Sequence, residues 1–261
     1  MTFSDLLKEP SLQVPLYVLI TVLGIMFGSF LNVLIYRIPK KEEFVKTASH
    51  CMKCNHKLAW YDNIPLFSWL SLGGKCRYCK EPISKQYPII EATNGVLWLS
   101  VFLLQGFTPT AILTSAMASG LLALSVIDWR TYEIANGWHV FFLILGAINL
   151  ALNYQNWLTY TIGFFCVSIP LLLIYIISGG RAIGGGDVKL MAACGFLIGW
   201  QNALLALVVG CIVGSVIHIL RMKITKEGHV LAMGPYLSIG ILVAALFGSP
   251  IINWYLSLFL A

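Results

Sequence analysis

The chain has 261 residues, of which 58% are hydrophobic and only 11% are charged, and its mean hydropathy is +0.82. Soluble domains carry about 45–50% apolar and about 25% charged residues, so this composition excludes an ordinary soluble enzyme and a disordered chain. The net charge of +6 lies entirely within residues 37–87, which hold ten basic and four acidic residues. We therefore predict an all-α polytopic membrane protein with one basic loop.

Eight apolar runs follow one another along the chain and predict about eight transmembrane helices. A helix needs about 20 residues to cross a bilayer, so the short run 188–200 is the weakest of the eight. The first run is too long for a signal peptide and has no basic region before it, so we expect it to remain as a membrane helix. The runs are 13–36, 88–106, 109–128, 137–153, 157–178, 188–200, 202–220 and 231–248.

Basic residues predict the orientation of these helices. Loop 37–87 is the most basic, and the positive-inside rule places it in the cytoplasm, with the N-terminus outside. The loops 129–136, 179–187 and 221–230 then also lie inside, and each carries at least one Arg. We expect the basic loop to face membrane lipid head groups and expect no nucleic-acid partner.

Two Cys-x-x-Cys pairs lie in this loop, Cys51/Cys54 and Cys76/Cys79, with 21 residues between them. Two such pairs can place four thiolates tetrahedrally around one Zn²⁺. Disulfides are not expected in the cytoplasm, and a loop of this size cannot build much of a core without a metal. We predict a structural zinc staple; a redox dithiol is the alternative.

Three carboxylates lie within or at the ends of apolar runs, where acids are costly and often functional. We expect Glu91 to be an interface residue paired with Lys85 or Arg77. Asp128 and Asp187 are expected to lie at one depth, at the inner face of the membrane. Two carboxylates that share a proton are the arrangement that an aspartyl protease needs.

The glycine run before Asp187 removes side chains where an extended substrate backbone must come close. We expect Gly184, Gly185, Gly186 and Lys189 to line the substrate. Asp187 begins a predicted helix and Asp128 ends one, and the two helix dipoles then favour an ionised Asp187 and a protonated Asp128.

Six motifs, in order over residues 22–247, resemble the type IV prepilin peptidases, which are GxGD membrane aspartyl proteases. The resemblance implies that Asp128 and Asp187 are catalytic and that Cys51, Cys54, Cys76 and Cys79 bind zinc. It divides the chain into residues 1–36, a first helix; 37–87, a zinc loop domain; and 88–261, a peptidase domain. The motifs are FGSFLNVLIYRIP (27–39), the two cysteine pairs, WYDNIPLFSWLSLGGKCRYCKEPISKQYPIIE (60–91), IDWRTYEIAN (127–136), GGGDVKLM (184–191) and MGPYLSIG (233–240).

The resemblance further implies cleavage of the basic leader of type IV prepilins or pseudopilins at the cytoplasmic face of a bacterial inner or plasma membrane. It also implies N-methylation of the new N-terminus with S-adenosylmethionine, although no GxGxxG nucleotide motif is present. The alternatives are a peptidase without methyl transfer, a zinc-stapled transporter or scaffold whose acids bind ions, and a thiol redox carrier.

Overall fold

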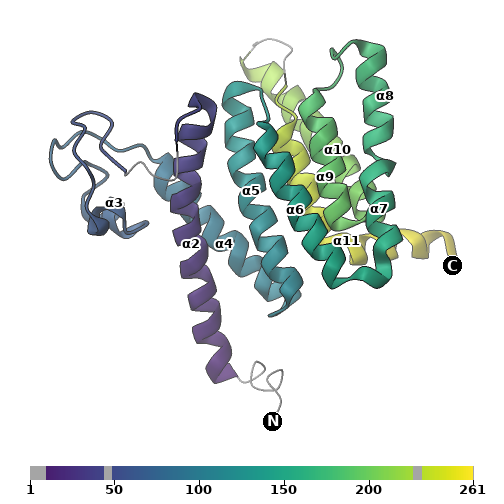
Figure 1. Cartoon of the computed structure of the whole chain (residues 1–261), viewed down its shortest axis with the longest axis horizontal. Coiled ribbons are helices and arrows are strands. Elements are labelled where there is room, and N and C mark those ends of the chain that lie inside the picture. Colours follow the sequence, from purple (N-terminus) through teal and green to yellow (C-terminus); the bar gives the residue numbers. More distant parts are fainter. Residues whose placement is uncertain (1–9, 44–48, 226–230, 261) are drawn as a thin grey trace. The chain divides into compact units, whose positions relative to one another are not determined.

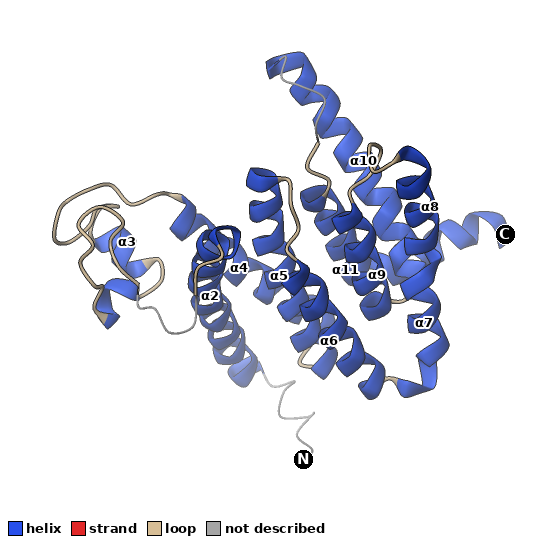
Figure 2. Cartoon of the chain, turned by 45° about the horizontal axis from the view of Figure 1, so that its top comes forward, coloured by secondary structure: helices blue, strands red, loops and turns tan. Residues whose placement is uncertain are grey.

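The structure is a computed structural model and describes residues 10–43, 49–225 and 231–260. Within these residues every regular element is a helix, and strand pairing is limited to two isolated bridges in the cysteine loop (Figure 2). The expectation of an all-α protein is therefore confirmed. The expected orientation of the N-terminus concerns residues 1–9, which lie outside the described residues.

Among the described residues, six helices are long and apolar enough to cross a membrane: Leu12–Lys40, Gln86–Gln105, Pro109–Thr131, Tyr154–Ser178, Trp200–Ile224 and Gly234–Phe259. These correspond to six of the eight expected spans, and they make the chain a multi-pass membrane protein. The other two expected spans coincide with shorter helices, α6 (Asn136–Leu152) and α9 (Gly185–Ile198). The count of eight therefore stays a prediction.

The chain divides into two compact units, residues 1–119 and 120–261. In the first unit, α2 (Pro10–Lys40) and α4 (Gln86–Gln105) pack side by side (Figure 1). The cysteine loop joins them and contains the short helices η1 (Trp60–Asn63) and α3 (Phe67–Ser71). The three-part division expected from the sequence stays a prediction.

Small residues allow α2 and α4 to approach closely. A Cβ at Gly28 would lie 2.7 Å from the Cα of Glu91, so no larger residue fits at this crossing. Beside it, the buried Asn94 donates to the Gly24 carbonyl at 2.7 Å and accepts from Ser119 at 2.8 Å. A buried amide whose nitrogen and oxygen both form hydrogen bonds helps to fix the register of helices inside a membrane.

The second unit holds the end of α5 (Pro109–Thr131), α6, α7 (Trp157–Cys166), α8 (Ser168–Ser178), α9, α10 (Trp200–Thr225) and α11 (Gly234–Leu260), with the one-turn helix η2 (Tyr154–Asn156) before α7. Helix α9 is the centre of this unit: it packs against α6, α7, α8, α10 and α11, and nine of its 14 residues are buried. A Cβ on either Gly163 of α7 or Gly195 of α9 would overlap the other residue's carbonyl oxygen. Both positions therefore require glycine.

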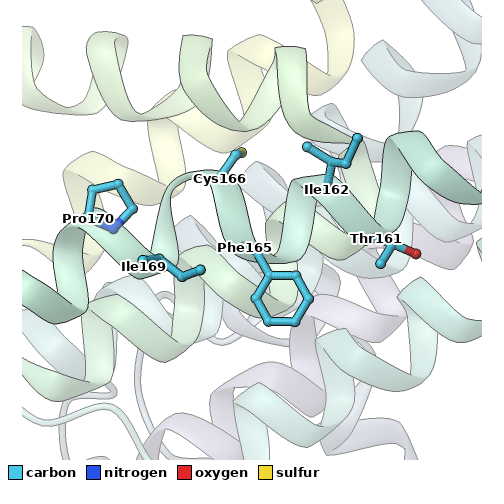
Figure 3. Close-up of a pocket in the computed structure, with 6 residues that line it drawn as sticks. All are labelled: Thr161, Ile162, Phe165, Cys166, Ile169 and Pro170. Atoms are coloured by element: carbon cyan, nitrogen blue, oxygen red, sulfur yellow. The ribbon is translucent and has the colours of Figure 1, made fainter.

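The expected span 157–178 is broken in the structure. Helix α7 ends at Cys166 and α8 begins at Ser168, and α8 continues α7 end to end (Figure 1). Pro170 causes the break, because proline has no N–H to donate to the Cys166 carbonyl. The outer surface at this break is a shallow apolar groove of about 400 Å³ that includes Phe165 and Ile169 (Figure 3).

Candidate active site

Asp128 and Asp187 are brought together in the second unit, where both are at least nine-tenths buried. Asp128 lies in the last turn of α5, and Asp187 lies in the first turn of α9. The two carboxylates are close enough for their charges to interact. The ends of α5, α9 and α11 that carry this site lie on the same side of the bundle (Figure 1). A pair of buried acids can hold a single shared proton, because two like charges in one apolar site repel.

The end of α5 is defined by a left-handed residue. Tyr132 has a φ of 55° and donates its N–H to the Asp128 carbonyl at 2.8 Å, which closes the last turn. The backbone then runs extended into α6. Because Asp128 lies in this closed last turn of α5, its side chain points into the bundle. This side chain is 4% exposed.

Asp128 is held by the beginning of α11. Its Oδ2 accepts the backbone N–H of Gly234 at 2.9 Å, and this donor lies 106 residues further along the chain. A Cβ at Gly234 would lie 2.6 Å from Oδ2 and 3.0 Å from Cγ, so the carboxylate occupies the space where a side chain would begin. The contact therefore requires glycine at this position.

The hydrogen bond from Gly234 changes the expected difference in protonation between Asp128 and Asp187. The sequence placed Asp128 only at the negative end of a helix dipole, whereas its carboxylate also faces the positive end of α11. Asp187 lies at the positive end of α9. Both carboxylates thus lie at helix N-termini, and the dipole argument no longer assigns the proton to Asp128.

The three glycines form the entry to α9. Gly184 is the extended residue before the helix, and a Cβ there would lie 3.0 Å from Asp187 Oδ2. A Cβ at Gly186 would lie 3.1 Å from the Cβ of Ile134. Side chains at these two positions would therefore crowd Asp187 and Ile134. Lys189 donates to Asn136 Oδ1 at 3.3 Å and so ties α9 to the start of α6.

His139 of α6 was not expected to belong to the site. Its Nε2 lies 3.0 Å from the Gly186 carbonyl oxygen, and the residue is 6% exposed. A carbonyl only accepts hydrogen bonds, so Nε2 carries the proton and donates it. The imidazole thereby fixes the peptide next to Asp187. A histidine in an apolar run is the only sequence signal for this contact.

Replacing His139 with Phe is expected to lower the rate of the predicted cleavage about tenfold. The lost buried hydrogen bond contributes about 1–1.5 kcal/mol to holding the peptide beside Asp187 in place. His139→Gln, whose amide can still donate from a similar position, is the matched control and should retain most activity. The measurement is the initial rate of the leader cleavage that the sequence predicts, with variants of equal thermal stability. Equal rates for the two variants would show that the hydrogen bond does not position Asp187.

The four cysteines of the loop form one cluster, and all four sulfur atoms lie within 4.8 Å of one another. The Sγ atoms of Cys51 and Cys79 are 3.8 Å apart. Zn–S bonds of about 2.3 Å in a tetrahedron place the sulfurs about 3.8 Å apart, so the cluster fits a zinc ion. The expected clustering is confirmed.

Each Cys-x-x-Cys pair and the residue after it form a tight turn, called a knuckle, and the two knuckles have the same backbone conformation. Asn55 and Lys80 each follow the second cysteine of a pair, and their φ angles of 59° and 61° turn the backbone back on itself. Their N–H groups donate to the carbonyls of Cys51 and Cys76 at 2.9 and 3.0 Å. Each turn thus points two sulfurs at one centre.

Backbone N–H groups at Cys54 and Lys53 lower the pKa of the Cys51 thiol to about 6. The Glu81 N–H acts in the same direction on Cys79, but burial and the other cysteines together raise the pKa of the Cys79 thiol to about 11. The backbone donors therefore favour the thiolate form at Cys51, which is the form of cysteine that binds a metal. Four thiolates leave no open coordination position for water, which fits a structural ion.

We expect purified protein to contain one zinc per chain with sulfur-only ligation, measured by elemental analysis and X-ray absorption. Cys76→Ser should abolish zinc binding, whereas Cys211→Ser, on the exposed surface of α10, should not. Protons compete with the metal for the thiolates, so zinc should dissociate as the pH falls. Folded protein without zinc would contradict this assignment.

Glu91 does not pair as expected. It is 5% exposed, and its Oε2 accepts the Leu66 N–H at 2.7 Å. Arg77 instead pairs with Asp62 at 2.8 Å. The expected pairing with Lys85 or Arg77 is wrong, because the Leu66 backbone N–H binds the Glu91 carboxylate and Arg77 pairs with Asp62.

Comparisons with known proteins identify the family of the chain. Residues 22–105 match the "Bacterial Peptidase A24 N-terminal domain" and residues 115–219 match the "Type IV leader peptidase family". A protein of Stutzerimonas stutzeri named "Prepilin leader peptidase/N-methyltransferase" is 34% identical over 90% of this chain and 92% of its own length. A protein of Pseudomonas aeruginosa with the same name is 32% identical over 92% of this chain and 93% of its own length.

No solved structure matches the chain significantly. The two family matches together cover most of the chain, and the relatives align over nearly their full length. This protein therefore belongs to the type IV leader peptidase family.

Proposed function

We propose that this protein cleaves the leader from type IV prepilins or pseudopilins with Asp128 and Asp187 as its catalytic residues. The observation that carries the proposal is the pair of interacting, buried carboxylates at the ends of α5 and α9. The names of the relatives supply the substrate class.

The mechanism follows from the pair sharing one proton. The ionised carboxylate removes a proton from a water molecule, and the protonated carboxyl donates a hydrogen bond to the scissile carbonyl oxygen. The water oxygen then bonds to the carbonyl carbon. When the C–N bond breaks, the new amine takes a proton from the dyad. The pair titrates as a unit, so we assign the proton to both residues together.

The glycines before Asp187 support substrate binding in this proposal. Gly184 is extended, and no side chain projects from the backbone between Gly184 and Gly186. A substrate strand can therefore approach the Asp187 carboxylate along this backbone. We propose that Gly184, Gly185, Gly186 and Lys189 contact the substrate, with Lys189 also holding α6 and α9 together.

The active site lies at the cytoplasmic face in this proposal, and the N-terminus lies outside. A basic leader stays on the cytoplasmic side of a membrane for the same reason as basic loops, so the bond after it lies at that interface. Zinc, when bound, cross-links Cys51, Cys54, Cys76 and Cys79 and holds the loop in its fold; it takes no part in bond cleavage.

N-methylation with S-adenosylmethionine is the second proposed activity, from the names of the relatives. The described residues form no strand–helix nucleotide unit, and the cavities beside α2 and at the break between α7 and α8 are almost wholly apolar, so neither of these cavities suits this cofactor. We assign no residue to it. Incubation with a labelled methyl donor separates the bifunctional enzyme from a peptidase alone.

The test of the proposal is co-expression with a candidate prepilin, read by a mobility shift and by the mass of the new N-terminus. A shortened product that needs this protein supports the proposal. If the product still forms with Asp128→Ala, the acids are not catalytic, and an ion-binding or scaffold role replaces the peptidase.

A further inference from the structure

The segment Leu58–Leu72 differs in composition from the rest of the cysteine loop. Its 15 residues, LAWYDNIPLFSWLSL, contain one charged residue, Asp62. The loop residues on either side carry most of its charge, including Lys53 and Lys57 before the segment and Lys75 after it. Such an apolar composition is unusual for a loop segment that is surrounded only by water.

The apolar side chains of this segment are exposed. Trp60 is 79% exposed, Phe67 is 65% exposed and Leu70 is 68% exposed. Tyr61 and Ile64 are also exposed, and Ile64 lines the same cavity as Trp60. Exposed aromatic and aliphatic side chains grouped in this way indicate a contact with lipid or with another protein.

The segment also lies beside the middle of α2. Residues Trp60, Asn63, Ile64, Pro65 and Leu66 form a cavity of about 390 Å³ together with Val22, Ile25 and Met26 of α2. Val22 and Met26 are themselves 47% and 55% exposed. The segment thus continues an apolar, outward-facing surface of a membrane-spanning helix.

Helix geometry gives the depth in the bilayer at which the segment contacts α2. At 1.5 Å per residue, Met26 lies about 21 Å along the helix from Lys40. The span Leu12–Lys40 is about 43 Å long, which exceeds the hydrocarbon core of about 30 Å by about 13 Å. Even if that whole excess projects from the Lys40 end, Met26 lies about 8 Å inside the hydrocarbon. The residues packed beside Met26 therefore lie below the membrane surface.

The backbone of the segment suits an apolar surrounding. Asp62, Leu66, Phe67, Ser68 and Leu70 all donate their N–H groups within the protein. The single charge is neutralised, because Asp62 accepts from Arg77 at 2.8 Å. Backbone that enters a bilayer must satisfy its polar groups internally in this way.

Glu91 holds the segment at this level. Leu66 has a φ of 58° and a ψ of −51°, and the Phe67 N–H bonds to the Pro65 carbonyl at 2.6 Å, so Leu66 is the centre of a γ-turn. This conformation is strained for a residue other than glycine and persists where its surroundings fix it. The buried Glu91 carboxylate, which accepts the Leu66 N–H, provides that support.

We propose that Leu58–Leu72 is immersed in the bilayer leaflet on the side of the cysteine loop, where Trp60, Phe67 and Leu70 contact lipid acyl chains. The flanking lysines lie at the level of anionic head groups and match their charge. The zinc knuckles are then anchored to the membrane by a segment between them, as well as by α2 and α4. The proposal does not depend on the peptidase function.

The test uses the full-length, zinc-loaded protein in vesicles of phosphatidylethanolamine and phosphatidylglycerol that contain a lipid with a diazirine on its acyl chain. After illumination, adducts are located by mass spectrometry. We expect adducts on residues 60–70 and on the exposed Ile177 of α8, which is the positive control. Met52, which is 55% exposed and lies in the first knuckle, should stay unlabelled.

Glu91 provides a matched pair of variants. Glu91→Ala removes the acceptor for Leu66 and should lower labelling of residues 60–70 several-fold relative to Ile177, while Glu91→Gln keeps an acceptor and should not. If residues 60–70 stay unlabelled in native protein while Ile177 is labelled, the proposal is overturned.

Discussion

Prepilin cleavage is expected to disappear in both Asp128→Asn and Asp187→Asn, with a loss of at least about 10³-fold in rate. Asparagine has nearly the same shape as aspartate but can neither remove a proton from water nor hold the shared proton. Each acid needs the other, so the double variant should be no slower than either single variant. The measurement is the initial rate of leader removal in detergent or vesicles.

Glu133→Gln is the matched control for this prediction. It makes the same carboxylate-to-amide change five residues after Asp128, at an exposed position outside the pair, and should leave the rate unchanged. Both aspartate variants should still insert and retain their thermal stability. Substantial cleavage by either of them would remove that residue from the mechanism.

Gly234→Ala is expected to lower the cleavage rate about 10²-fold, because displacing a catalytic group by about 1 Å has an effect of that size. The new Cβ would lie 2.6 Å from Asp128 Oδ2, so the carboxylate must move and its hydrogen bond to the Gly234 N–H must lengthen. The KM for prepilin should change little, since the glycines proposed to contact the substrate are untouched.

The control for this prediction is Gly137→Ala, near the start of α6, where a Cβ meets nothing within 4 Å. Alanine is the better helix former, so this variant should be at least as stable as the native protein and equally active. The pH–rate profile adds a second readout. A displaced Asp128 should shift the profile, whereas a purely structural defect would lower the rate equally at every pH.

The sequence predicted the parts of this protein that depend on local spacing. Helices long enough to span a membrane appear as apolar runs, and the cysteine cluster appears as two Cys-x-x-Cys pairs, because a knuckle is formed by a single tight turn. The break after Cys166 could have been predicted from Pro170. It was missed because the hydropathy of the run continues through it.

The contacts that the sequence did not predict are made to backbone groups distant in the chain. The Gly234 N–H donates to Asp128, and the Leu66 N–H donates to Glu91. His139 donates to the Gly186 carbonyl. Every residue has a backbone N–H or C=O available, so such partners leave no signature in residue type. The membrane depth of Leu58–Leu72 was missed for a related reason: the charges around it gave the whole loop a polar average.

The hydrogen bond between Gly234 and Asp128 also sets a lower limit on the size of a working catalytic fragment. Residues 115–219, which match the peptidase family, contain both aspartates but end before α11 begins at Gly234. A fragment with those boundaries would carry both aspartates without the Gly234 N–H that holds Asp128. Any truncated or transplanted form of this enzyme must therefore extend through the last helix.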